Sequence, residues 1–221
     1  MIDTAGSAKS LPIQNTHLPV RLLLAGLLVL AWSAINPHDY FTWFLEVSPA
    51  ILGTAVLAAT YRRFRFTNLV YTLVFIHAVI LMVGGHYTYE KMPLFNWLRD
   101  TFGLARNYYD RLGHIAQGFI PAMIVRELLL RTSPLRPGKW LFVITVCICL
   151  AISAGYEFFE WWVAVGTGEK ADAFLATQGD PWDTQWDMFL CLCGAVASLL
   201  LLSRLQDRQM YTGPAGPLTS C

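Results

Sequence analysis

The chain has 221 residues, of which 55% are hydrophobic and 14% charged, and its formal net charge is +1. An average soluble domain is about 45–50% apolar and about 25% charged. The composition therefore excludes a disordered chain, a basic nucleic-acid-binding protein and a disulfide-rich secreted module. The apolar residues are gathered into runs of membrane length, which indicates an integral membrane protein.

Six segments predict transmembrane helices, since crossing a bilayer takes about 20 mostly apolar residues. In chain order they cover residues 18–35, 41–61, 69–87, 112–130, 140–165 and 186–203. The first qualifies if Arg21 extends to the headgroups, and the fourth and sixth are weaker because each has polar residues at one end. A cleaved signal peptide is disfavoured for the first, since no basic cluster directly precedes it. We predict an all-α polytopic bundle of about six transmembrane helices within residues 18–205.

The basic residues predict the orientation of this bundle, because Lys and Arg concentrate in cytoplasmic loops. With the N-terminus inside, eleven of the 16 Lys and Arg residues are cytoplasmic and the other five lie outside. Both termini are then cytoplasmic, as a segment at residues 1–17 and a tail at residues 206–221. The outer connection at residues 90–109 mixes apolar side chains with charges behind Pro93, which predicts a short interfacial helix.

Ionisable residues recur near the ends of the last three predicted helices. Such a residue costs at least ~2.5–3.5 kcal/mol at the centre of a membrane-spanning helix, so it is usually functional. Asp110 and His114 are four residues apart and share a helix face, which Gln117 extends. Glu157 and Glu160 share a face of the next helix. Two neighbouring carboxylates in a low dielectric share a proton or hold a cation.

The last helix repeats the four-residue spacing with Asp183 and Asp187, and Asp180 lies just upstream. Because the helices alternate in direction, these residues all lie at the outer boundary, where a bundle brings them together. We expect catalytic roles for Asp110, His114, Glu157 and Glu160, and metal coordination by Asp187, Glu157 and Glu160. We expect substrate contacts from His86, Arg106, Gln117, Tyr156, Asp180 and Asp183.

Structural alternatives stand beside these predictions. Unrelated packing at the membrane interface is the alternative for the whole set. Asp180 and Asp183 are equally suited to capping the last helix and interacting with its dipole. Glu46, about one turn into the second helix, either joins the same site or extends to the headgroups. His77, alone in an apolar helix, is interpreted as a core residue.

Several motifs resemble those of the YjdF-type family of bacterial inner-membrane proteins. They are NPHD (36–39), FTWFLE (41–46), HYTY (86–89), RNYYDRLGH (106–114), YEFFEWW (156–162) and TQGDPWDTQWD (177–187). The resemblance covers residues 22–205 and implies a multi-pass protein of the bacterial inner membrane. A fainter likeness to VanZ-like membrane proteins rests on Asp110, His114, Glu157, and Asp187 with Gly194, and implies action on lipid headgroups or envelope lipids.

Two functional hypotheses follow. The first is an enzyme at the outer face that acts on a phospholipid headgroup or a lipid-linked envelope precursor. His114, oriented by Asp110, is then the general base or nucleophile, and the carboxylates act as acid or hold a divalent metal. The second is a non-enzymatic scaffold, or a transporter with an outward-facing proton or cation site. The scarcity of polar side chains in the inner halves disfavours transport but not a scaffold. The expected partner is the lipid bilayer, not nucleic acid.

Overall fold

The computed structural model describes residues 17–211, except for the side chains at positions 169, 170 and 172, and every regular element in it is helical. The predicted segment at residues 1–17, its last residue excepted, and the end of the predicted tail, residues 212–221, lie outside the described residues. The elements are α1 (Leu18–Ser33), α2 (Tyr40–Thr60), α3 (Asn68–Tyr87), the 3-10 helix η1 (Tyr89–Lys91), α4 (Pro93–Phe102), α5 (Tyr109–Thr132), α6 (Lys139–Thr167), the 3-10 helix η2 (Gly168–Ala171), α7 (Asp172–Leu175) and α8 (Asp183–Tyr211).

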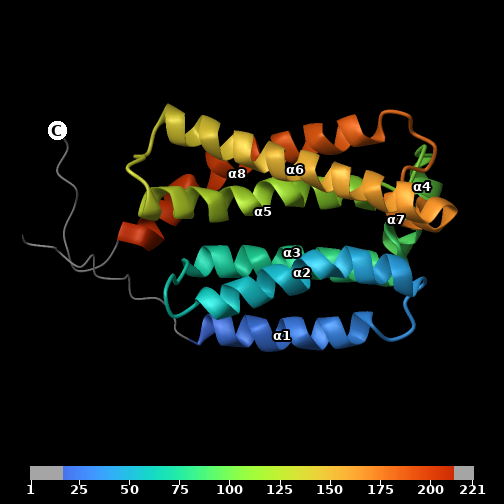
Figure 1. Ribbon diagram of the computed structural model, residues 1–221, viewed down its shortest axis with the longest axis horizontal. Coiled ribbons are helices and arrows are strands. Elements are labelled where there is room, and N and C mark those ends of the chain that lie inside the picture. The colour runs from blue at the N-terminus through green and yellow to red at the C-terminus, as the bar shows by residue number, and fades with distance from the viewer. Residues whose placement is uncertain (1–16, 212–221) are drawn as a thin grey trace, which may run out of the picture.

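The six long helices run side by side, and α1 begins where α8 ends, at the left of Figure 1. α5 packs against α3, α6 and α8, whereas α1 and α2 both pack on α3. α8 continues well past the predicted span of 186–203. The helical architecture predicted from the sequence is therefore confirmed.

Four helices, α2, α3, α6 and α8, are long and apolar enough to cross a membrane, and α1 is apolar but shorter. α5 is as long as these but carries many polar side chains. Most of these polar side chains are buried, because α5 is packed against α3, α6 and α8. A membrane helix whose polar side chains face the interior of a bundle does not present them to lipid, which explains the weak apolar signal of this segment.

The crossing of α5 and α8 is held close by two glycines. A Cβ atom built on Gly118 would overlap the backbone carbonyl of Cys191, and one built on Gly194 would overlap that of Ile115. Small residues let the backbones of membrane helices approach closely. The register of α5 against α8 is therefore fixed by backbone contact.

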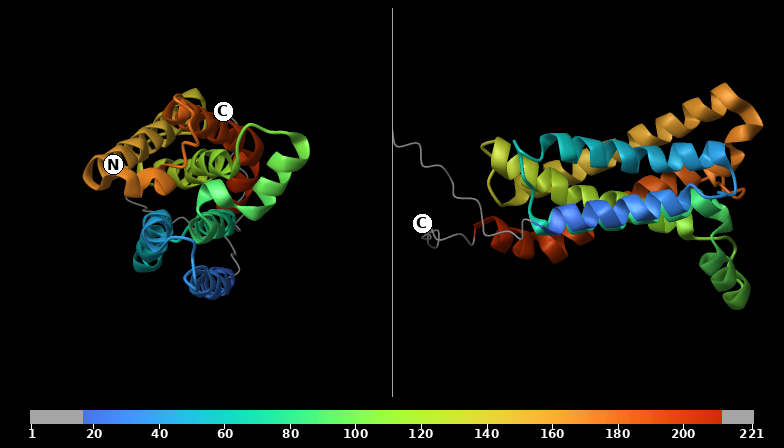
Figure 2. Two further views of the ribbon diagram at one scale, coloured as in Figure 1. Left: turned by 90° about the vertical axis from the view of Figure 1, so that its right-hand side faces the viewer. Right: turned by 90° about the horizontal axis from the view of Figure 1, so that it is seen from below.

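α4 has the amphipathic composition predicted for an interfacial helix. None of its residues is buried, and Leu94, Trp97 and Phe102 are exposed. It begins at Pro93 and ends at Gly103, whose positive φ of 62° allows the chain to turn. Figure 2 shows α4 projecting away from the bundle at one end.

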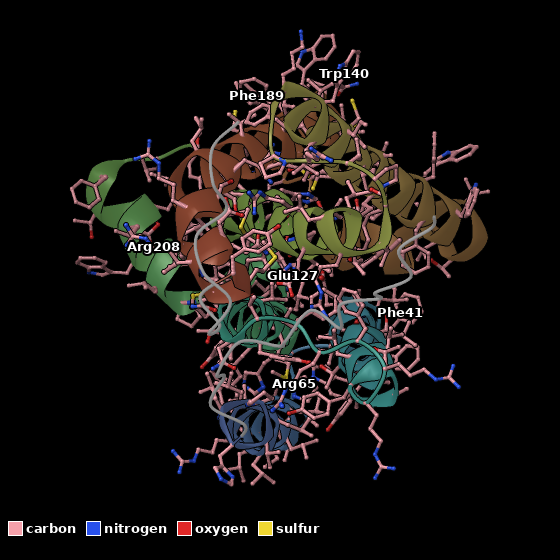
Figure 3. The ribbon with its side chains drawn as sticks, turned by 90° about the vertical axis from the view of Figure 1, so that its left-hand side faces the viewer. Phe41, Arg65, Glu127, Trp140, Phe189 and Arg208 are labelled. Atoms are coloured by element: carbon pink, nitrogen blue, oxygen red, sulfur yellow. The ribbon has the colours of Figure 1, made fainter. Side chains whose placement is uncertain are left out.

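A cluster of polar side chains connects the helices at the opposite end from α4. We call it the Glu127 cluster; its members are Thr67, Arg126, Glu127, Arg131, Gln206 and Asp207. The Glu127 carboxylate accepts hydrogen bonds from the Thr67 backbone N–H (3.0 Å), the Thr67 hydroxyl (2.8 Å) and Arg131 (2.7 Å). Arg126 donates to Gln206 and Asp207. Glu127 lies in the middle of the bundle in Figure 3, where Trp140 and Phe189 project outward. Every carboxylate in this cluster has a cationic partner.

The N-terminus of α2 is capped by Asp39, whose carboxylate accepts the backbone N–H of Thr42 at 2.7 Å. This hydrogen bond lowers the pKa of Asp39 below its ordinary value of 3.8. The folded state therefore binds that proton more weakly than the unfolded state, so the contribution is present at neutral pH and is lost as the pH falls through the lowered pKa. We expect Asp39→Ala to destabilise the protein by about 1 kcal/mol at pH 7.

Thermal unfolding in detergent at pH 7 and pH 3 tests this prediction. The difference between the wild type and Asp39→Ala should shrink at pH 3, and Asp39→Asn, which keeps a capping oxygen, should remain close to the wild type at pH 7. An Asp39→Ala defect of equal size at both pH values would contradict the assignment.

Candidate functional site

Ionisable side chains from four helices meet at the end of the bundle where α6 ends and α5 and α8 begin. We call this group the polar site; its members are Glu46, Arg106, Asp110, Arg111, His114, Glu157, Glu160, Asp180, Asp183 and Asp187. It lies at the right-hand end of the bundle in Figure 1, the end that also carries α4 and α7. The antiparallel course of α5, α6 and α8 thus brings together the predicted acidic and histidine residues.

His114 is buried between α5, α6 and α8. Its Nε2 lies 3.5 Å from Asp110 Oδ1 and 3.6 Å from Asp187 Oδ1. Its Nδ1 lies 3.0 Å from Gln117 Oε1 and 4.0 Å from Glu157 Oε1. The predicted Asp110–His114–Gln117 face is therefore observed, with each side chain in contact with the next.

Arg111 joins α5 to α8 in the interior of the polar site. Its guanidinium donates to Asp183 (2.6 Å), Asp180 (3.1 Å) and Asp187. Arg106, just before α5, donates to Asp183 at 2.6 Å and to the carbonyl of Ala176 at 2.8 Å. Two arginines thus hold the start of α8 against the start of α5. Arg111 was not among the residues predicted from the sequence for this site.

Asp180 and Asp183 combine the two roles that the sequence left open. Asp180 accepts the backbone N–H of Trp182 at 2.9 Å, directly before α8 begins, and also pairs with Arg111. Asp183 is the first residue of α8 and pairs with both arginines. These residues therefore shape the helix start and belong to the polar site.

α6 contributes Glu157 and Glu160 from one face, with Tyr156 beside them. Glu157 is buried, and the charges that act on it include His114, Asp110 and Asp183. Glu160 is half-buried and interacts electrostatically with Glu157, His114 and Asp110. The Tyr156 ring packs against those of Phe159 and Phe174. The two glutamates of α6 lie next to α5, the helix that carries His114, as predicted.

Glu46 belongs to the polar site, which resolves the alternative that the sequence left open. The side chain is buried, not extended to the headgroups, and it interacts with Tyr89, Asp110 and His114. Thr88, at a positive φ of 56°, turns the chain after α3 so that the Tyr89 ring packs against Gly84 and Gly113. Burial, and secondly the nearby Glu46, raises the pKa of Tyr89 well above its usual value. Tyr89 is therefore a neutral hydrogen-bond donor.

Asn107 and Gln178 hold the two connecting segments beside the polar site. The Asn107 backbone N–H donates to Gln178 Oε1 at 2.9 Å, and Gln178 Nε2 donates back to the Asn107 carbonyl at 2.9 Å. The Asn107 side chain also donates to the Met92 carbonyl (3.1 Å) and accepts the Tyr109 N–H (3.0 Å). Both residues lie in motifs quoted above, but their pairing was not predicted from the sequence.

The structure places His86 apart from the proposed substrate contacts. Its Nδ1 lies 3.0 Å from the Ser33 carbonyl, and its ring stacks on Trp32 with centroids 4.5 Å apart. These contacts connect α3 to α1. In this fold the His86 side chain therefore faces α1.

Exposed tryptophans mark the end of the bundle that holds the polar site. Among the residues described, they are Trp32, Trp97, Trp161, Trp162, Trp182 and Trp186, whereas Trp140 lies at the other end. Tryptophan is enriched at membrane–water interfaces, where its ring lies at headgroup level. The polar site therefore lies at the end of the bundle where these side chains gather.

One group of side chains in the described part of the chain has the geometry of metal ligands. Asp110, His114 and Asp187 each offer a ligand atom, and these atoms all lie within 4.8 Å of one another. The sequence reasoning had combined Asp187 with Glu157 and Glu160 instead.

Residues 18–208 match a family described as predicted membrane protein (DUF2238). This chain belongs to that family. It is also 49% identical over 183 residues to the inner membrane protein YjdF of Escherichia coli strain K12, an alignment that covers 83% of this chain and 88% of that protein. No solved structure matches the chain. The resemblance found in the motifs is confirmed, and the chain is a multi-pass protein of the inner membrane.

Proposed function

We propose that this DUF2238 protein is an enzyme that acts on the headgroup of a phospholipid or of a lipid-linked envelope precursor. The polar site is its active site, at the outer face that the basic residues predict. The observation that carries the proposal is a surplus of buried carboxylates within a membrane bundle. Ionisable residues in such a position are expensive and usually functional.

The Glu127 cluster is the internal comparison for this surplus. There, each carboxylate meets an arginine, as a structural ion-pair network requires. In the polar site, the described side chains include seven carboxylates (Glu46, Asp110, Glu157, Glu160, Asp180, Asp183 and Asp187) against two guanidinium groups (Arg106 and Arg111) and one imidazole (His114). Such unmatched groups are better suited to a substrate or a cofactor than to holding helices together.

The surroundings of the polar site favour a lipid as the substrate. Two features support a position at headgroup level, namely the exposed tryptophans at this end of the bundle and the amphipathic helix α4 at the same end. Glu160 is half-buried, lies about one helical turn after the buried Glu157 and directly precedes the exposed Trp161 in α6. A headgroup approaching from the interface therefore meets Glu160 first.

The chemistry proposed here is the attack of water or a hydroxyl group on a headgroup phosphoester. Glu157 Oε1 has no hydrogen-bond partner among the described residues, and we assign Glu157 as the base that takes the proton of the attacking O–H. Glu160 in its protonated form returns a proton to the leaving oxygen as its bond to phosphorus breaks. His114 and the two arginines stabilise the charge that develops between them.

Lipid analysis in a strain that lacks the protein tests the proposal. We expect one headgroup class or envelope precursor to accumulate in the deletion strain and to return to normal with the wild-type gene. Glu157→Gln should fail to restore it, since loss of a general base slows a reaction by about 10²- to 10⁴-fold. The measurement is mass spectrometry of total lipid extracts, with membrane levels of each variant checked by immunoblot.

The matched control is Glu90→Gln, the same substitution at the same end of the bundle. Glu90 pairs with Lys91 in η1 and is not a member of the polar site. It should restore the lipid profile fully. Full restoration by Glu157→Gln, at normal membrane levels, would favour the scaffold hypothesis over an enzyme.

A further inference from the structure

We propose that Asp110, His114 and Asp187 bind a divalent transition-metal ion, of the Zn²⁺ or Mn²⁺ class, inside the polar site. The inference rests on the proposed function, because it places this ion at the active site. Its test measures metal content and not turnover. It replaces the ligand set expected from the sequence with one side chain from α8 and two from α5.

The first support is the spacing of the candidate ligand atoms. His114 Nε2 lies 3.5 Å from Asp110 Oδ1 and 3.6 Å from Asp187 Oδ1. These separations are too long for hydrogen bonds, which span about 2.7–3.2 Å. Ligand atoms placed tetrahedrally around Zn²⁺, at bonds of about 2.0–2.2 Å, are about 3.3–3.6 Å apart. The two separations at His114 Nε2 therefore fit edges of a metal coordination shell, and the two carboxylate oxygens lie within 4.8 Å of each other.

The second support is the orientation of the imidazole. Gln117 Oε1 is an acceptor 3.0 Å from His114 Nδ1, an arrangement that suits a ring with its proton on Nδ1. In the neutral ring Nε2 then has a free lone pair, and it points at two carboxylate oxygens. A metal ion between these three atoms would take the Nε2 lone pair and the two carboxylate oxygens as ligands, and Asp187 Oδ1 would be shared with the Arg111 guanidinium. A ligating histidine that donates its other N–H to an oxygen is the usual arrangement around metals.

The third support comes from buried oxygens outside the ligand pairs just described. Asp110 Oδ2 and Glu157 Oε1 have no hydrogen-bond partner within the described residues, and both side chains are more than nine-tenths buried. Glu157 Oε1 lies 4.0 Å from His114 Nδ1, on the side of the imidazole that faces Gln117, so this carboxylate is next to the ring but is not a ligand at Nε2. An ion of charge +2 offsets part of the excess negative charge that the two arginines leave.

The ligand types indicate the class of metal. One imidazole and two carboxylates suit Zn²⁺ or Mn²⁺ better than Ca²⁺, which prefers oxygen ligands alone. Three protein ligands leave a coordination position open, as in catalytic zinc sites. That position suits a phosphate oxygen of the headgroup, or the water that Glu157 deprotonates.

Metal analysis of the purified full-length chain tests the inference. The chain is expressed in medium with Zn²⁺ and Mn²⁺, purified in detergent, and its metal content is measured by inductively coupled plasma mass spectrometry. We expect about one ion per chain, and an occupancy at least about tenfold lower in Asp187→Asn and His114→Gln. Asp100→Asn, an exposed carboxylate on α4 that pairs with Arg99, is the matched control and should keep its metal.

A second measurement needs no variant and guards against misfolding. A chelator should lower the unfolding temperature of the wild type, and added Zn²⁺ or Mn²⁺ should restore it, because a ligand that binds the native state stabilises it. The inference would be overturned if the purified wild type contains no metal and neither the chelator nor the added Zn²⁺ or Mn²⁺ changes its unfolding temperature. Glu157→Gln separates the two proposals, since it should keep the metal yet fail in the lipid assay.

Discussion

Replacing Arg111 with methionine should destabilise the protein by about 3–5 kcal/mol, which is the usual effect of removing one partner from a buried ion pair. Arg111 is almost fully buried and pairs with Asp180, Asp183 and Asp187. Methionine fills a similar volume but leaves these carboxylates with Arg106 as their remaining described guanidinium neighbour. The negative charges at the start of α8 then repel one another, which weakens the packing of α8 against α5.

The measurement is the unfolding temperature in detergent, followed by tryptophan fluorescence. Arg99→Met is the matched control, because Arg99 pairs with Asp100 on the exposed helix α4 and such pairs contribute at most about 1 kcal/mol. Arg111→Lys should lie between the two, since it keeps the charge but loses the forked geometry. Equal unfolding temperatures for Arg111→Met and Arg99→Met would show that Arg111 does not hold α5 and α8 together.

The helices were predictable because side chains that face lipid must be apolar, and runs of apolar residues can be recognised in the sequence. α2, α3 and α6 are exposed to lipid over much of their length, so their segments read clearly. α5 was one of the two weaker segments in the sequence, because its neighbours cover it and hydropathy measures contact with lipid. Its weakness as an apolar segment is a consequence of its central position.

The meeting of the acidic residues was also predictable, because topology alone decides which helix ends share a side of the membrane. What topology does not decide is the direction of each side chain around its helix. His86 lies near the correct end but faces Trp32 and Ser33, whereas Glu46 faces inward to Tyr89 and Asp110. These directions depend on how α3 packs between α1 and α2.

Charge counting by side hid the two residues with the largest structural roles. Neither Arg111 nor Glu127 was among the residues predicted for a site. Each is buried between helices and bonded to residues more than 50 positions away along the chain, such as Asp183 and Thr67. Pairings of that kind follow from helix packing, which a single sequence does not display.

Gly118→Ala should be as damaging as the loss of Arg111, although it adds one methyl group. The new Cβ would overlap the Cys191 carbonyl and lie 2.9 Å from the Ala195 backbone nitrogen. Overpacking a tight core typically costs 1–3 kcal/mol, and a backbone obstacle cannot rotate away as a side chain can, so we expect about 3 kcal/mol or more. Gly194→Ala, against Ile115, should behave in the same way.

Gly155→Ala is the matched control for this prediction, since a Cβ on Gly155 in α6 meets nothing within 4 Å. It should leave the protein unchanged or raise the unfolding temperature, because alanine favours helix by about 1 kcal/mol over glycine. Gly118→Ala should also lower the metal content, since the separation of α5 from α8 moves Asp187 away from Asp110 and His114. A Gly118→Ala chain as stable as Gly155→Ala would contradict the close crossing on which the geometry of the polar site depends.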